Sequence, residues 1–163
     1  VPYGTAKLAR NRFLSWPQIK TLQQSGLVKI ASHSDNLHRG QAGNPMGSEF
    51  AAALSGYYRN GRYETAEEYR HRIEADLKTS ADKIERHTGV RPRIIVWPYG
   101  QFNQTAVNIA RKTGFDGSFS LYDRRLNRLS DGHIGRAMLD EGSDTAFLQA
   151  YLQEQLPRHR PQK

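Results

Sequence analysis

Two histidines five residues apart are the side chains of this sequence best suited to chemistry. His33 and His38 follow an apolar, partly β-branched run, Leu27 to Ala31, which reads as a short buried strand after Ser25-Gly26. Catalytic groups collect at the carboxyl edge of strands in α/β folds, and two neutral imidazoles there could share one divalent ion. Six histidines in a basic chain can also give such a pair by chance, so ordinary surface-loop histidines are the alternative that spacing alone leaves open.

A long amphipathic helix is expected downstream of this pair. Thr65 and Glu68 form a capping box, the pattern that starts helices, and Gly89 supplies the turn that ends them. Between these signals the apolar residues recur at three- and four-residue steps: Tyr69, Ile73, Leu77 and Ile84. A shorter helix upstream is predicted to start at the capping box of Ser15 and Gln18.

Strands and helices are expected to alternate in the rest of the chain. A buried strand is predicted over residues 93–97, with Pro98, Tyr99 and Gly100 at its carboxyl edge. A helix over residues 103–113, strands over residues 115–121 and 134–139, and a last helix capped by Asp144 follow. The apolar face of the last helix comprises Phe147, Leu148, Tyr151 and Leu152. This order indicates a parallel α/β fold.

The connection over residues 39–62 is long for a compact domain, and connections of that length usually serve a function. Its small residues from Ala51 onward favour one helical segment that runs into Tyr57 and Tyr58. Together with Tyr63, these tyrosines either line a sugar groove by stacking or pack the loop against the domain. The sequence leaves both interpretations open.

Composition bounds the classes of function. The 163 residues suffice for one domain with a sizeable core, and no stretch approaches transmembrane length. The chain has no cysteine, which excludes disulfides and thiolate metal sites. The formal net charge is +8, but basic and acidic residues are mixed along the expected helices, and only residues 158–163 form a basic tail. No nucleic-acid recognition module is evident, so nucleic acid is not an expected partner.

The residues around the histidine pair carry a family resemblance. The segment Ile30–Gly40, read with the Val-Trp-Pro-Tyr-Gly segment over residues 96–100, resembles the polysaccharide deacetylases of carbohydrate esterase family four, the NodB-homology family. Within that family the chain is most similar to the poly-β-1,6-N-acetyl-D-glucosamine N-deacetylases of biofilm-forming bacteria. The resemblance covers about residues 11–139 and includes the Asn44-Pro45 loop.

This resemblance implies an α/β fold of the distorted (β/α) barrel type and a hydrolase that cleaves linear amide C–N bonds. It implies a divalent ion (zinc, nickel, cobalt or iron) held by His33, His38 and an aspartate, with Ser34 stiffening the ligand loop. It also implies that the Tyr99 backbone N–H helps to hold the oxyanion, and that Pro98 shapes the turn that aims it. The expected substrate-contacting residues are Trp97, Asn44, Tyr57 and Tyr58.

The sequence departs from the family pattern in three respects. The family carries an Asp-Asp pair on an early strand, as general base and third metal ligand, and this chain contains no such pair. Asp35 follows His33 by two residues, and ligation of the same ion by both would need an unusual loop. Many relatives have arginine where Val96 stands, and many have a late histidine as general acid. His133 is the candidate by region, although the biofilm branch lacks a catalytic histidine there.

We therefore expect residues 1–157 to be the C-terminal portion of a deacetylase domain, incomplete at its N-terminus. The expected function is metal-dependent N-deacetylation of N-acetylglucosamine units in an exported biofilm polysaccharide, at a periplasmic or cell-surface location. The expected partners are that polysaccharide, a preceding segment of the same enzyme that supplies the third ligand, and a following C-terminal domain of the kind relatives often carry. Alone, the chain is expected to be inactive. A non-catalytic carbohydrate-binding domain that retains the fold is the alternative.

Overall fold

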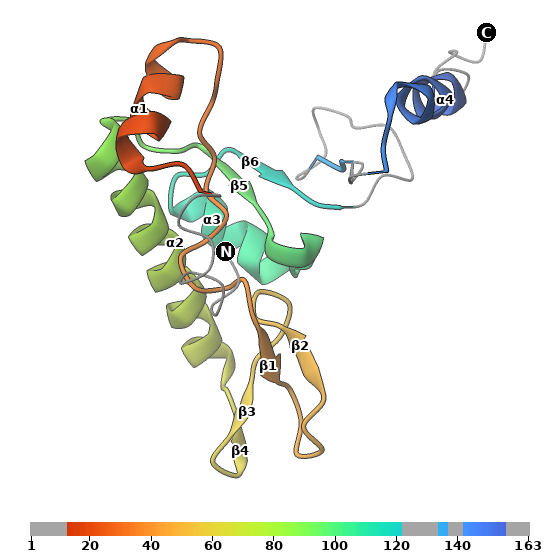
Figure 1. Cartoon of the computed structure of the whole chain (residues 1–163). Helices are drawn as coiled ribbons and strands as arrows, with labels where there is room; N and C mark the ends of the chain where they lie inside the picture. Colours follow the sequence, from red (N-terminus) through yellow and green to blue (C-terminus); the bar gives the residue numbers. More distant parts are fainter. Residues whose placement is uncertain (1–12, 122–133, 137–141, 156–163) are drawn as a thin grey trace, which may run out of the picture.

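The computed structural model describes residues 13–121, 134–136 and 142–155. Figure 1 shows one long helix, α2, along a side of the molecule, and two β-hairpins at one end. The helices are α1 (Trp16–Gln24), α2 (Ala66–Thr88), α3 (Gln104–Lys112) and α4 (Thr145–Gln155), with a 3-10 turn over Pro98–Gly100. The strands are β1 (Gly40–Ala42), β2 (Glu49–Ala51), β3 (Tyr58–Arg59), β4 (Arg62–Tyr63), β5 (Ile94–Val96) and β6 (Gly117–Phe119).

Parallel chain segments form the centre of the molecule. Strand β5 pairs in parallel with β6, with Ile95 opposite Ser118. A single parallel bridge joins Ser32 to Ile95, and another joins Ile134 to Phe119. In the described ranges the neighbouring parallel segments thus follow one another in sequence, and α2 and α3 are the helical crossovers between them (Figure 1). The expected parallel α/β architecture is confirmed for these segments.

The strand expected over Leu27 to Ala31 is not formed. Leu27 is 91% exposed, and the segment reaches β5 only at its end, where the Ser32 N–H donates to the Ile94 carbonyl (2.9 Å). The Val96 N–H donates in turn to the Ser32 carbonyl at 2.8 Å. An apolar, β-branched run forms a strand only where a neighbouring strand pairs with it and side chains pack on it. Within the described residues, pairing with β5 begins only at Ser32.

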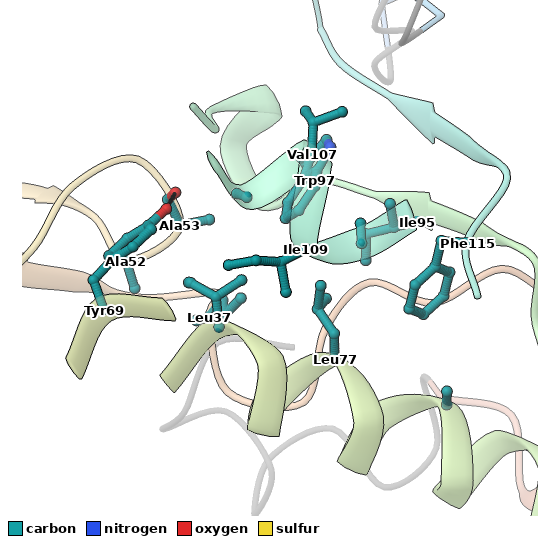
Figure 2. Packing of buried hydrophobic residues seen from close by; sticks show 14 residues of the cluster. Leu37, Ala52, Ala53, Tyr69, Leu77, Ile95, Trp97, Val107, Ile109 and Phe115 are labelled. Carbon is teal, nitrogen blue, oxygen red and sulfur yellow. Dashed lines mark hydrogen bonds between the residues drawn. The ribbon is translucent and has the colours of Figure 1, made fainter. Parts of the chain in front are cut away.

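Helix α2 supplies one wall of the core and is as predicted. Thr65 and Glu68 make both hydrogen bonds of the capping box, and Gly89 ends the helix with a φ of 82°. The expected inner face is buried. Figure 2 shows Leu77 of α2 and Ile109 of α3 directed into the same space as Ile95 of β5. Burial of each such side chain contributes roughly 1.5–3 kcal/mol, so this layer holds α2 and α3 against the parallel segments.

The hydrogen bonds of Glu68 at the start of α2 predict that its contribution to stability depends on pH. Hydrogen bonds from the Arg62 guanidinium, and then from the Thr65 backbone N–H, lower the pKa of Glu68 to about 2. A carboxylate with a lowered folded-state pKa stabilises the fold above its ordinary pKa of about 4.5, and that contribution is lost as pH falls towards 2. Thermal unfolding should therefore show Glu68→Gln less stable than the native chain at pH 6, with the gap closing between pH 4.5 and pH 2. A gap that is constant with pH would contradict this.

Two β-hairpins replace the helical segment expected from Ala51. Strands β1 and β2 pair antiparallel, and so do β3 and β4. Asn60 and Gly61 join the latter pair with φ values of 52° and 78°, a turn with both central residues left-handed. An Asn-Gly pair between strand-forming tyrosines is a strong hairpin signal, which the sequence interpretation overlooked.

The C-terminal helix is partly as expected. Asp144 caps α4, since its carboxylate accepts the Phe147 N–H at 2.8 Å. The expected apolar face is not buried, because Phe147, Leu148 and Leu152 are all exposed and α4 lies apart from the core in Figure 1. The strand predicted over residues 134–139 is represented by the Ile134 bridge, and its residues 137–139 lie outside the described residues. No described helix is long and apolar enough to cross a membrane.

Candidate functional site

The two histidines lie side by side at the carboxyl edge of the parallel segments. The centroids of the His33 and His38 rings are 4.9 Å apart, and the ring planes are inclined by 52°. His33 directly follows Ser32, where the chain pairs with β5, and Tyr99 follows β5 itself. The loop therefore brings both imidazoles to the edge at which α/β folds place their functional groups.

The tautomer of His33 follows from its hydrogen bond. Its Nδ1 lies 2.7 Å from the Val96 carbonyl oxygen. A carbonyl can only accept, so Nδ1 carries the proton and the Nε2 lone pair is directed elsewhere. Metal-binding histidines are oriented in this way by a backbone carbonyl or a carboxylate. Val96 thus acts at this site through its main chain.

Electrostatics favour the neutral form of His33. The ring is solvent-exposed by surface area, yet the surrounding protein removes enough water to lower its pKa below the usual 6.5. Burial is the largest cause and the charges of His38 and Arg136 add to it, whereas the Val96 carbonyl favours the protonated ring. A neutral imidazole is the form that binds a metal ion.

His38 has a buried ring nitrogen that needs a partner. Its Nδ1 is enclosed and forms no hydrogen bond with any described residue. The ring packs against the Tyr99 ring, with centroids 4.4 Å apart. Buried polar atoms without a partner are rare in folded proteins, and each one calls for an explanation such as an ion bound there. This orphaned nitrogen, on a ring that lies beside the His33 ring, fits a divalent cation.

Helix α2 holds the loop between the two histidines. The Asp76 carboxylate accepts the backbone N–H of Asp35 at 2.9 Å and that of Asn36 at 2.6 Å. Ser34, at φ 72°, accepts the Leu37 N–H at 3.2 Å, in keeping with the expected stiffening of the loop. The Asp35 carboxylate pairs with Lys83, so it is committed to α2 rather than to the histidines.

Sequence reasoning missed Asp76. The signal was a polar residue three positions after Ile73, within the buried stripe of α2, where an isolated carboxylate must find donors. Burial raises the pKa of Asp76, and the two backbone N–H groups oppose that shift. Its bonds span 40 residues or more of sequence, so only the fold shows the partner.

Removing the Asp76 carboxylate should weaken metal binding. In Asp76→Ala the N–H groups of Asp35 and Asn36 lose their acceptor, and the histidine loop is no longer held to α2. Loss of such an outer contact typically costs 10–100-fold in metal affinity, which a zinc titration against a competing chelator would measure. Glu74→Ala, an exposed acid on the same helix that pairs with Lys78, is the control and should bind zinc normally. Unchanged zinc affinity in a folded Asp76→Ala protein would contradict the role of Asp76 in holding the histidine loop.

A strained turn places Tyr99 over His38. Tyr99 has φ 56° and Gly100 φ 65°, both left-handed, and Pro98 before them is fully buried. A non-glycine residue in this region is uncommon and is often found at functional sites. The Tyr99 N–H forms no hydrogen bond within the described part of the chain. It therefore retains the donor capacity that the oxyanion role requires.

Two residues expected to contact the substrate, Trp97 and Asn44, make contacts that stabilise the fold. Trp97 is 0% exposed and stacks on Phe102 in the core, which gives its side chain a packing role, and a substrate contact by Trp97 stays a prediction. The Asn44 side-chain oxygen accepts the N–H groups of Met46 and Ser48, at 3.0 and 3.1 Å, and so shapes the β1–β2 turn. A substrate contact by Asn44 stays a prediction. His133 lies outside the described residues.

Two of the three tyrosines line a cavity. Tyr57 and Tyr58 contribute to a cavity of about 380 Å³ between the hairpins and α2. Tyr63 instead packs edge-on against Tyr58, with ring centroids 5.0 Å apart, and remains largely exposed. Tyr57 and Tyr58 are therefore placed where they could contact a ligand, which stays a prediction, whereas Tyr63 packs within its own hairpin and not against the body of the domain.

The described residues offer two metal ligands. Among residues 13–121, 134–136 and 142–155, no group of three or more His, Cys, Asp or Glu side chains could hold an ion. The arrangement can nevertheless bind a cation through two imidazoles and present one main-chain N–H beside them. That combination suits hydrolysis of a carbonyl compound, provided that a carboxylate joins the site.

Comparison with known proteins agrees with this chemistry. The polysaccharide deacetylase family model matches residues 4–118. The chain is 33% identical over 141 residues to the poly-beta-1,6-N-acetyl-D-glucosamine N-deacetylase of Escherichia coli (strain K12). The match covers 85% of this chain but only 21% of that protein.

Solved structures show the same relationship. A de-N-acetylase from Aggregatibacter actinomycetemcomitans aligns with a TM-score of 0.83 at 41% identity, over 93% of this chain and 58% of that one. The BpsB deacetylase domain of Bordetella bronchiseptica aligns with a TM-score of 0.73 at 44% identity, over 77% and 48%. On the extent of the family match, this chain belongs to the polysaccharide deacetylase family.

Proposed function

We propose that this chain is the metal-binding part of a hydrolase that removes acetyl groups from N-acetylglucosamine units of a β-1,6-linked polysaccharide. The observation that carries the proposal is the contact of the His33 and His38 rings beside the Tyr99 turn. The Escherichia coli relative is named for this reaction, and the chain spans about a fifth of its length. Family membership supports amide hydrolysis, and the relatives' names support the substrate.

The metal would be held by His33 through Nε2 and by His38. A bound divalent ion supplies Lewis-acid polarisation of the acetyl carbonyl and lowers the pKa of water towards about 7. The Val96 carbonyl keeps His33 in the required tautomer, and Asp76 holds the backbone between the two histidines. The third ligand and the general base are proposed to be aspartates on a segment of the same enzyme that precedes this chain. Zinc, nickel, cobalt and iron all suit imidazole and carboxylate ligands.

Tyr99 is proposed to act through its main chain. Its N–H would donate to the oxyanion that forms when water attacks the acetyl carbonyl, and one such donor is typically worth about 3 kcal/mol in the transition state. The left-handed conformation of Tyr99 and the buried ring of Pro98 hold that N–H in place before the substrate arrives. His133 remains a candidate general acid by its region of the sequence.

The wider architecture is also part of the proposal. The parallel segments would form one arc of a distorted (β/α) barrel, completed by strands from outside the described residues. Residues 1–157 would belong to the deacetylase domain and residues 158–163 to a basic tail. A polysaccharide substrate that is exported would place the enzyme in the periplasm or at the cell surface, and a following domain would assist in handling the glycan.

Acetate release from a β-1,6-linked N-acetylglucosamine pentamer tests the proposal. The protein would be assayed as this chain and as a chain joined to an upstream segment with the expected Asp-Asp pair, each with and without added zinc. We expect metal-dependent release only from the longer protein, because the shorter one has two ligands and no base. Glycan binding without release by the longer protein would favour the alternative, a carbohydrate-binding domain. Full activity of the short chain would contradict the proposed division of ligands.

A further inference from the structure

The cavity between the hairpins and α2 carries an unbalanced positive charge. Its lining residues include three arginines, Arg39, Arg59 and Arg72, and the tyrosines Tyr57 and Tyr58, and they include no acidic residue. A smaller cavity of about 160 Å³ continues it and shares Tyr57 and Arg59. Both lie on the segment that directly follows the metal-binding loop.

Arg72 does not contribute to that excess charge. It pairs with Glu64 through Nε and Nη2, both at 2.7 Å, and the Glu64 side chain is only 1% exposed. The Arg72 guanidinium also lies over the Tyr57 ring, 5.6 Å from its centroid. The ion pair and the cation–π contact fix Arg72 as a neutralised part of the wall and hold the Tyr57 ring in position.

Arg39 and Arg59 are different. Neither guanidinium forms an ion pair or a side-chain hydrogen bond within the described ranges, and both side chains are exposed at the cavity. Arg59 faces Arg62 across the β3–β4 hairpin, and the Arg62 charge is satisfied by Glu68. Two unpaired guanidinium groups thus border a tyrosine-lined cavity of about 380 Å³, a volume suited to one or two sugar units.

We infer that this cavity is a sugar subsite that accepts N-acetylated units of the polysaccharide and rejects deacetylated, ammonium-bearing units. The inference rests on the proposed function, because it concerns the product of that reaction. The tyrosine rings would stack on a sugar, and the guanidinium groups would donate to its hydroxyl and acetyl oxygens. After deacetylation, the same unit has lost the acetyl oxygen as an acceptor and carries a protonated amine, whose positive charge repels these arginines.

Like charges within a few ångströms are mutually destabilising, and the effect is larger where water is partly excluded. Arg39 directly follows His38, so the subsite adjoins the reacting centre along the chain. A deacetylated unit next to the unit being cleaved would therefore be disfavoured in the cavity. The consequence is spaced rather than contiguous deacetylation, and a polymer that stays partly acetylated.

The experiment uses the metal-loaded enzyme containing this chain and three β-1,6-linked pentamers. One pentamer is fully acetylated. Each of the other two carries one free amine, on the unit before the central unit in one isomer and on the unit after it in the other. The ratio of kcat/KM for acetate release from the acetylated pentamer and the amine-bearing pentamers is measured at pH 6, in low and high salt. We expect a preference of at least about fivefold for the acetylated pentamer over one of the two amine isomers, weakened by salt, since screening reduces exposed charge repulsion.

The arginine variants decide the cause. Arg39→Ala/Arg59→Ala should bring the ratio close to one, Arg59→Lys should retain most of the preference, and Arg59→Glu should favour the amine-bearing pentamer. Arg86→Ala removes the same charge from an exposed position at the far end of α2 and should leave the ratio unchanged. A native ratio near one for both isomers, or a preference that survives in the double variant, would overturn the inference. Failure of the loaded enzyme to release acetate from any pentamer would instead overturn the proposed function.

Discussion

Replacing His38 with alanine is expected to abolish metal-dependent deacetylation. The described residues offer two ligands, and the buried Nδ1 of His38 has no other partner there. Loss of an outer contact already costs 10–100-fold in metal affinity, so loss of a ligand should reduce zinc affinity by more than about 100-fold. Acetate release should fall by a similar or greater factor at limiting zinc. Zinc titration and acetate release on the same preparation of the longer protein, which includes the upstream segment, would measure both.

His71→Ala is the matched control for this variant. His71 is exposed on α2, and its Nε2 lies 3.1 Å from the Glu67 carboxylate. It should retain zinc affinity and activity, which separates ligation from the mere loss of an imidazole. Near-native zinc affinity in a folded His38→Ala protein would exclude His38 as a ligand.

Replacing Gly100 with alanine is expected to damage both the fold and the turn that carries Tyr99. Gly100 has a φ of 65°, and a Cβ there would lie 2.6 Å from the Leu121 backbone nitrogen and 2.6 Å from its Cβ. Strain at positive φ costs about 1 kcal/mol, and overpacking against backbone adds typically 1–3 kcal/mol. We expect a loss of about 2–4 kcal/mol in the free energy of unfolding. The displaced Tyr99 N–H should also lower kcat more than tenfold.

Gly89→Ala provides the comparison. Gly89 has a similar φ of 82°, at the end of α2, but a Cβ added there would meet no atom within 4 Å. It should therefore lose only the backbone-strain part, about 1 kcal/mol, and keep its kcat. Chemical denaturation and steady-state kinetics on both variants, made in the longer protein with the upstream segment, would distinguish these outcomes. Equal destabilisation of the two would show that Leu121 relaxes at no cost.

Local sequence signals predicted the helices and strands whose end signals and apolar pattern lie within their own residues. Helix α2 was predictable because Thr65, Glu68 and Gly89 satisfy its ends, and the apolar spacing between them matches one helical face. Helix α3 was predictable for the same reason, with Asn103 accepting the Ala106 N–H at 2.9 Å. Strand β5 was predictable because its apolar residues lie between Pro92 and Pro98, which limit it on both sides.

Elements that depend on pairing or contacts that the local sequence does not reveal were harder to predict. The run from Leu27 has strand-forming residues, but the described chain pairs with it only at Ser32. The first hairpin depends on Asn44 accepting two N–H groups within its turn, a contact that composition does not reveal. The second hairpin could have been predicted from its Asn60-Gly61 pair. The small residues before it favoured a helix instead, and the helix was predicted.

The candidate site divides in the same way. His33, His38 and Tyr99 were identified through their local motifs, and the fold brings their rings together. Asp76 was missed because its role depends on backbone donors 40 or more residues away. The burial of Trp97 was not predicted, because its motif position does not tell which side of the strand end it faces, and it faces the core.

The central claim is that His33 and His38 hold one divalent ion beside Tyr99. Anomalous X-ray diffraction at the zinc edge, from crystals of the zinc-loaded protein, tests it most directly. We expect one strong anomalous peak, about 2.0–2.1 Å from a ring nitrogen of each histidine, with the His33 Nδ1 still bonded to the Val96 carbonyl. A peak bonded to only one of the two rings, or located away from both, would contradict it.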